Sequence, residues 1–290
     1  MSSTQLPDLP SVALTLHPEI QALLTDCDAL RDQLARLIAE HDLMAYTVGP
    51  NLDAEYQAQI GRYELERFRV DLEVRRLRRT LELLQAALNR GESITRNKVA
   101  AQLAREYADW EHRMRELAAQ LRHAENRLAA LAGSEESAEV RRLYRALARR
   151  LHPDVNPHLT PEDRKLWLRV AEAYRNGDLD TLRAIMLITH DTPMRLIEAE
   201  TEPSDACAAL RQQRDQLRGH VRRLLDETAA LQTVFPFTER QNLADPAWIA
   251  QRQAAIQAEV QPLHETRQAL EYAVAQLWRV TSDEQQPGSD

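Results

Sequence analysis

The sequence predicts an all-α protein: an elongated antiparallel bundle of coiled-coil helices, a helical hairpin in the middle and a second helical hairpin near the C-terminus. The 290 residues are 43% hydrophobic and 28% charged, but only 5% are aromatic and only 7 are glycine. Cores with so few aromatic residues are built from Leu and Ala in narrow seams, which favours packed helices. Apolar residues also recur at alternating three- and four-residue steps, the heptad pattern of helices that pack on one another.

The first heptad seam contains one of the two cysteines. Its members are Ile20, Leu23, Cys27, Leu30, Leu34, Leu37 and Met44. Cys27 is therefore expected to be a packing residue. Cys27 and Cys207 lie far apart and form no CxxC or CxxH pattern, so we expect inert, reduced thiols rather than a disulfide, a zinc site or a catalytic thiol.

Residues 17–133 are expected to form three coiled-coil helices joined by short turns. Pro50 lacks a backbone N–H, so the first turn is predicted at residues 47–51. Gly91 is expected to end the second helix, and Thr95 is expected to cap the third.

The remaining chain divides at its breaks in periodicity. Short helices at 134–190 form a separate module, a linker is expected at 191–205, and two further seams at 206–281 form the C-terminal helical hairpin. The terminal residues 1–16 and 282–290 are expected to be disordered tails.

The turn of the C-terminal hairpin contains two of the three phenylalanines, Phe235 and Phe237. They are expected either to anchor the loop by burial or to form a docking tip for a partner.

The first helix of the 134–190 module is amphipathic. Its apolar face carries Val140, Leu143, Tyr144, Leu147 and Leu151, and its opposite face carries Arg142, Arg145 and Arg149. The i, i+3 and i+4 spacing predicts one buried face and one cationic face.

The next helix has a well-specified start, because Thr160 precedes a proline and stands three residues before Asp163, a variant of the capping box. Gly177 is expected to end it. Its apolar face carries Leu166, Trp167, Val170, Ala173 and Tyr174. The two helices bracket an exposed loop at residues 151–158.

The segment Glu139–Asp154, EVRRLYRALARRLHPD, resembles the second helix and His-Pro-Asp loop of J-domain (DnaJ-type) co-chaperones. Leu166–Tyr174, LWLRVAEAY, is similar to the third helix of that family. The resemblance is limited to about residues 139–174. The typical first helix is replaced by the end of a long coiled-coil helix, and the sequence has no Gly/Phe-rich linker or cysteine-rich zinc module.

In that family, the loop and the basic helix bind a DnaK-class heat-shock chaperone and stimulate its ATP hydrolysis. The resemblance therefore implies the chaperone-binding residues His152, Pro153, Asp154, Arg142, Arg145 and Arg149. The loop residues would contact the chaperone, and the arginines would steer the complex toward an acidic groove. The coiled-coil arms would hold an unknown client or assembly protein.

The alternative is a structural coiled-coil scaffold or adaptor whose J-like hairpin no longer engages a chaperone. In that case the 152–154 loop is only a turn between two helices, and the arginine face is a solvated surface.

Several other function classes are disfavoured. The formal net charge of −8 and the pI near 5.7 argue against a nucleic-acid binder. The sequence has no HExxH, GxGxxG, P-loop or GxSxG pattern, and its 9 histidines are scattered. We therefore expect no enzyme activity, no cofactor and no metal site.

The expected location is the cytoplasm, because no signal peptide or apolar run long enough to cross a membrane is evident. Lysine occurs only at Lys98 and Lys165, an arginine bias that hints at a GC-rich bacterial source. The seams are compatible with a monomer or a homodimer.

Overall fold

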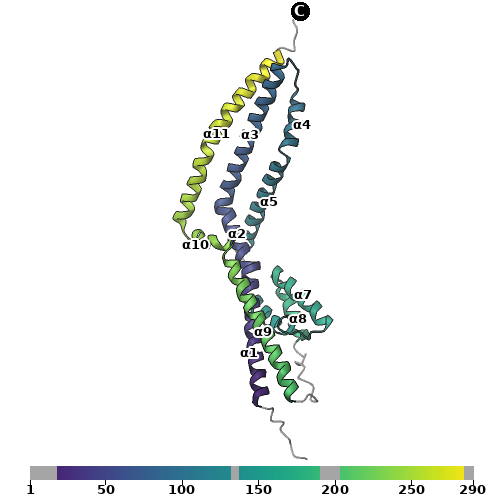
Figure 1. The fold of residues 1–290 in the computed structure, drawn as a ribbon. Coiled ribbons are helices and arrows are strands. Elements are labelled where there is room, and N and C mark those ends of the chain that lie inside the picture. Colours follow the sequence, from purple (N-terminus) through teal and green to yellow (C-terminus); the bar gives the residue numbers. More distant parts are fainter. Residues whose placement is uncertain (1–17, 132–136, 190–202, 284–290) are drawn as a thin grey trace, which may run out of the picture. The chain divides into compact units, whose positions relative to one another are not determined.

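The computed structural model describes residues 18–131, 137–189 and 203–283, and every regular element in these ranges is helical (Figure 1). The all-α prediction is confirmed. The expected tails at 1–16 and 282–290 and the linker at 191–205 lie wholly or largely outside the described residues.

The chain forms two compact units whose boundaries differ from the expected ones. Unit 1 combines Met1–Thr47 with Glu135–Leu231, and unit 2 combines Val48–Ser134 with Gln232–Asp290. The first of the three expected N-terminal helices therefore belongs with the middle module. The two helices of the expected C-terminal hairpin are assigned to different units.

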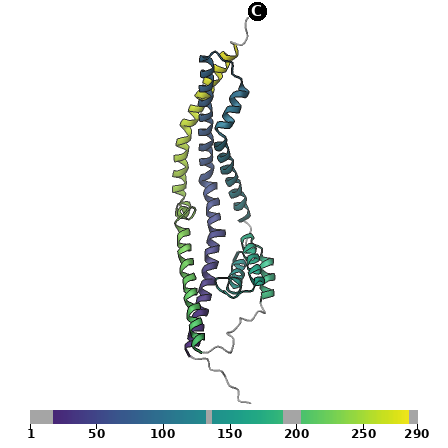
Figure 2. The same ribbon diagram turned by 45° about the vertical axis from the view of Figure 1, so that its right-hand side comes forward.

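In its described residues, unit 1 contains five α-helices. They are α1 (Pro18–Leu43), α6 (Ser137–Leu151), α7 (Pro161–Asn176), α8 (Leu179–Thr189) and α9 (Pro203–Gln232). Helices α6, α7 and α8 pack on one another, and α1 packs against α6. Helices α1 and α9 lie side by side and run in the same direction (Figure 2).

A single apolar core joins these five helices. Cys27 of α1 is fully buried in it, and its thiol lies 3.7 Å from the Leu210 carbonyl oxygen of α9. Burial raises the pKa of the Cys27 thiol, which opposes formation of the reactive thiolate. Among the buried residues are Ile20, Leu23, Leu34, Leu143, Leu147, Val155, Val170, Leu182, Leu217 and Val221.

Unit 2 is built from the remaining helices. The long members are α3 (Arg62–Asn89), α5 (Ala108–Leu131) and α11 (Pro246–Asp283). The shorter ones are α2 (Gly49–Tyr56), η2 (Gln57–Gly61), α4 (Arg96–Glu106), η3 (Phe237–Glu239) and α10 (Arg240–Leu243). The π-helical segment η1 (Met44–Val48) precedes α2.

The expected antiparallel packing is present where α3 faces α4 and α5. Arg79 of α3 bonds Glu106 of α4 at 2.9 Å, whereas Asn51, earlier in the chain, accepts a 2.6 Å bond from Arg127 of α5. Residues early in the α2–α3 segment thus contact residues late in the α4–α5 segment, so the two segments run in opposite directions.

Helix α11, in contrast, lies parallel to α3. Arg67 pairs with Glu259 at 3.2 Å, and Glu73 pairs with Arg267 at 2.8 Å. These helices share a small core that contains Val70, Ile256 and Val260. The expected self-paired hairpin at 206–281 is therefore replaced: α11 packs on α3, and α9 packs in the core of unit 1.

The turn predicted at residues 47–51 is wrong, because this stretch is helical. Pro50 occupies the first turn of α2, where a missing backbone N–H is tolerated. The preceding π-helical segment has wider i to i+5 bonding, which changes the register of bonding just before the proline.

The predicted helix ends are confirmed where the structure describes them. Gly91 and Gly177 have φ of 63° and 67°, the left-handed conformation that ends helices. The Thr95 side chain caps α4. The Thr160 hydroxyl accepts from the Asp163 N–H at 3.2 Å, and the Asp163 carboxylate accepts in return from the Thr160 N–H, which completes the capping box.

In the part of the chain that the structure describes, no helix combines the length and the apolar character that crossing a bilayer would require.

The capping box gives the first prediction. Thr160→Ala removes the oxygen that satisfies an otherwise unpaired N–H of α7 and should lower the free energy of unfolding by about 1 kcal/mol. Thr160→Ser keeps the oxygen and should change it by much less. Urea denaturation followed by circular dichroism measures both, and equal stabilities for the two variants would contradict this role of the cap.

Candidate functional site

The loop between α6 and α7 is positioned by an aromatic cluster. The rings of Tyr144 and Tyr174 stack at 3.9 Å between centroids, and the Trp167 ring lies 5.5 Å from Tyr144. The imidazole of His152 packs edge-on against Trp167 at 4.7 Å. Because these side chains come from both helices, the cluster fixes the hairpin and the start of the loop together.

The end of the loop is held by a buried side chain and a helix cap. Val155 is fully buried. The Asn156 side-chain amide donates to the carbonyl oxygens of Arg149 and Arg150 at 2.7 and 2.9 Å. These oxygens end α6 and have no partner within the helix, so the amide stabilises the point at which the helix stops.

His152 is an internal support of the loop. Its Nδ1 accepts a 3.1 Å hydrogen bond from the backbone N–H of Asp154, which requires a neutral imidazole on that side. Burial lowers the pKa of His152 below the ordinary value for histidine. The family resemblance implied that His152 contacts a partner, and this stays a prediction; within the chain its ring packs against Trp167.

Pro153 and Asp154 form the outward part of the loop. Pro153 is exposed, and 46% of the Asp154 side chain is accessible. The Asp154 carboxylate lies 3.2 Å from Nδ1 of His220 and 4.0 Å from the guanidinium of Arg223, both on α9. Asp154 is thus accessible, and α9 already places a guanidinium and an imidazole beside it, which also contact each other.

The predicted cationic face of α6 is only partly free. Arg142 and Arg145 are exposed on the helix that leads into the loop, and Arg142 lies 3.7 Å from Glu139 of the same helix. Arg149 instead pairs with Asp32 of α1 at 2.7 Å and lies 4.0 Å from Asp28. The apolar face of α6 is buried as predicted, which confirms the division of the helix into two faces. Arg149, however, is paired with α1 rather than freely exposed.

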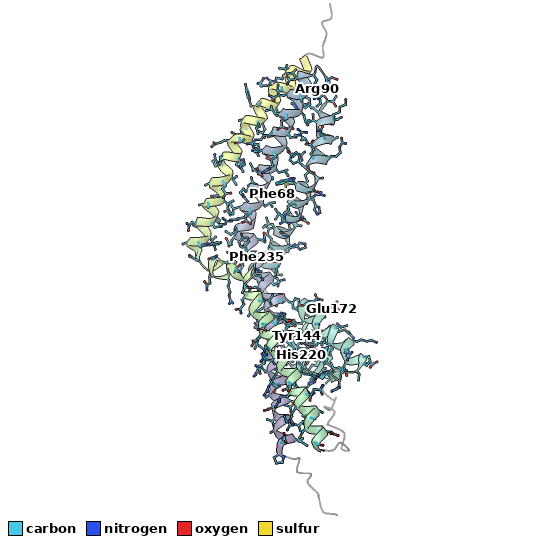
Figure 3. The ribbon with its side chains drawn as sticks, in the orientation of Figure 1. Phe68, Arg90, Tyr144, Glu172, His220 and Phe235 are labelled. Atoms are coloured by element: carbon cyan, nitrogen blue, oxygen red, sulfur yellow. The ribbon has the colours of Figure 1, made fainter. Side chains whose placement is uncertain are left out.

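Helix α1 also contacts the aromatic cluster. The Tyr144 hydroxyl donates to the Asp42 carboxylate. Burial, together with the charge of Asp42, raises the pKa of Tyr144. Figure 3 marks Tyr144 and His220 in unit 1. The heptad seam predicted the helix α1. The sequence pattern did not predict that its acidic residues Asp32 and Asp42 would contact α6.

The two phenylalanines of the possible docking tip are not fully buried. Phe235 is 50% exposed and packs edge-on against Tyr56 at 5.2 Å. Phe237 begins η3 and is partly buried. Phe235 therefore combines an anchoring contact with an accessible surface, so both interpretations of this loop retain support.

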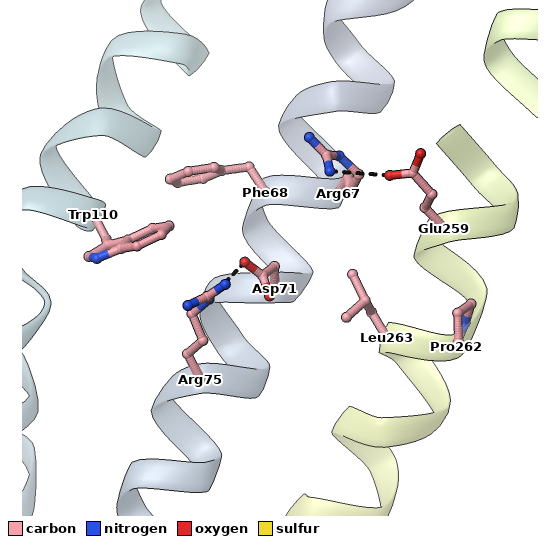
Figure 4. Close-up of a pocket in the computed structure, with 8 residues that line it drawn as sticks. All are labelled: Arg67, Phe68, Asp71, Arg75, Trp110, Glu259, Pro262 and Leu263. Carbon is pink, nitrogen blue, oxygen red and sulfur yellow. Dashed lines mark hydrogen bonds and ion pairs between the residues drawn. The ribbon is translucent and has the colours of Figure 1, made fainter. Parts of the chain in front are cut away.

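Unit 2 contains a groove of about 460 Å³ between α3, α5 and α11 (Figure 4). Phe68 and Trp110 stack at 5.5 Å on one side. Its charges pair with one another, Arg67 with Glu259 and Asp71 with Arg75. The groove therefore offers no unpaired charge that would select a ligand. Its lining is Arg67, Phe68, Asp71, Arg75, Trp110, Glu259, Pro262 and Leu263.

No protein-family model, curated protein or solved structure matches this chain. Within the described ranges, no three His, Cys, Asp or Glu side chains converge as metal ligands would. The loop between α6 and α7 is the candidate site because its backbone is held from both ends and its charged groups are accessible.

The lowered pKa of His152 gives the second prediction. Because the folded pKa lies below the unfolded value, the unfolded chain takes up a proton first as the pH falls through about 6.5. Stability should therefore decrease on acidification from pH 7.5 to 5.5, and His152→Gln should show a smaller decrease. Urea denaturation at the two pH values measures this, and identical pH dependence in both proteins would disprove it.

Proposed function

We propose that this protein is a J-domain-like co-chaperone that recruits a DnaK-class chaperone and stimulates its ATPase. The observation that carries the proposal is the loop held by contacts at both ends, which presents Pro153 and Asp154 at the end of a helix with Arg142 and Arg145 exposed. A carboxylate and a basic helix face suit a partner surface that offers a cation beside an acidic groove.

The proposal assigns distinct roles to the two parts of the site. Arg142 and Arg145 increase the rate of encounter through long-range attraction, which salt weakens. Asp154 makes the short-range contact, and Pro153 restricts the backbone beside it. His152 acts as a positioning residue, because it accepts from the Asp154 N–H and packs on Trp167.

The long helices of unit 2 serve as arms for a client or assembly protein, and the half-exposed Phe235, in the turn before η3, is a further candidate contact. We propose that the protein works with this partner in the cytoplasm. The arginine bias favours a bacterial source, and we propose a monomer or homodimer as the working form.

A second candidate function is supported by the ion pairs within unit 1. Because Arg149 and Asp154 already have partners on α1 and α9, the hairpin also fits a structural adaptor that no longer binds a chaperone.

Single-turnover ATP hydrolysis by a purified bacterial DnaK-class chaperone distinguishes the two functions. The wild-type protein should accelerate hydrolysis, and Asp154→Asn should reduce that acceleration by about tenfold or more, as expected when a central contact is lost. Arg145→Glu should raise the concentration needed for half-maximal stimulation, most strongly at low salt.

Asp163→Asn is a matched control, because it removes a carboxylate from the capping box of the same hairpin and leaves the loop unchanged. It should stimulate like the wild type. If wild type and Asp154→Asn give equal rates, the adaptor is the correct function.

A further inference from the structure

The carboxylate of Asp154 faces two basic side chains of its own chain, an imidazole and a guanidinium. His220 and Arg223 are three residues apart on α9, on the same side of the helix, and lie 3.2 and 4.0 Å from the same Asp154 oxygen. Arg223 is permanently charged, so the guanidinium is the constant cation opposite Asp154. The Arg223 guanidinium also contacts Nδ1 of His220, so the two side chains form one cluster beside the carboxylate. The contact joins residues far apart in sequence.

These side chains place beside Asp154 the kind of group that a chaperone would need to place there. The proposed function requires a cation on the chaperone surface opposite Asp154, and α9 already provides one. The same relation holds on the basic helix, where Asp28 and Asp32 of α1 provide acids for Arg149. The helices that flank the hairpin thus present charges of the sign expected of its partner.

The strength of the α9 contact suits a reversible competitor. The side chains of His220, Arg223 and Asp154 are 29%, 57% and 46% exposed. Exposed ion pairs shift equilibria by only about two- to fivefold. Such a contact weakens binding of a partner at Asp154 and does not prevent it.

The charged side chains of α9 in this contact can be replaced without disturbing the apolar core of unit 1. Helix α9 is held in unit 1 by the buried side chains of Leu210, Leu217 and Val221, whereas His220 and Arg223 lie toward the surface. Replacement of these two residues by glutamine therefore keeps the apolar packing of α9 and removes its charges opposite Asp154.

From these observations we propose that His220 and Arg223 form an autoinhibitory contact, in which α9 competes with the chaperone for Asp154. This inference rests on the proposed co-chaperone function. It adds a regulatory role for α9. A client or partner that binds the polar side of α9 and separates it from the loop would make Asp154 more available to the chaperone.

The test measures single-turnover ATP hydrolysis by the DnaK-class chaperone as a function of co-chaperone concentration. His220→Gln/Arg223→Gln should lower the half-stimulating concentration by about two- to fivefold and leave the maximal rate unchanged. Arg222→Gln is the matched control, because it removes a neighbouring exposed charge of α9 that is not part of the contact, and it should match the wild type. Circular dichroism confirms that each variant is folded.

A second measurement tests the contact without the chaperone. The side-chain nitrogen chemical shifts of His220 should differ between wild type and Asp154→Asn, because the substitution removes the charge opposite the ring. Unchanged shifts would overturn the inference.

The outcomes separate the inference from the proposed function. If the wild type stimulates the chaperone and the double variant has the same half-stimulating concentration, autoinhibition is overturned and the co-chaperone function stands. If neither protein stimulates a chaperone that responds to an authentic J-domain protein, both fail. Stimulation by the double variant at lower concentration than the wild type supports both.

Discussion

The contact of Tyr144 with Trp167 and Tyr174 is the interaction on which the geometry of the candidate site depends. It joins α6 to α7 and supports the His152 ring. Without this support the backbone of the loop would lose the hydrogen bond that His152 accepts from the Asp154 N–H. The outward direction of a polar loop thus follows from an apolar contact between two helices.

The flanking helices change the electrostatics of this hairpin. An isolated α6–α7 hairpin would carry a continuous basic face and a free loop carboxylate. In unit 1, α1 neutralises the end of that face at Arg149, and α9 places the Arg223 guanidinium and the His220 imidazole beside Asp154. What stays available is the exposed pair Arg142 and Arg145 together with a half-exposed carboxylate. The hairpin therefore acts as part of a larger folded unit.

Features set by a few neighbouring residues could be predicted from the sequence. The caps at Thr95 and Thr160 and the left-handed glycine at Gly177 depend only on local backbone geometry, and the structure contains all three. The prediction of a turn at Pro50 was wrong because a proline is tolerated in the first turn of a helix, so the chain stays helical there. The pairing of Asp154 with α9 depends on tertiary packing, for which local periodicity contains no signal.

Backbone amide NMR of the isotopically labelled protein, recorded with and without a DnaK-class chaperone in its ATP-bound state, tests whether the α6–α7 loop binds the chaperone. We expect the largest perturbations at the exposed face of α6 and at the 152–154 loop, with accompanying changes on α9 around His220 as its contact with Asp154 is replaced. Perturbations confined to unit 2, or none at saturating chaperone, would disprove binding through this loop.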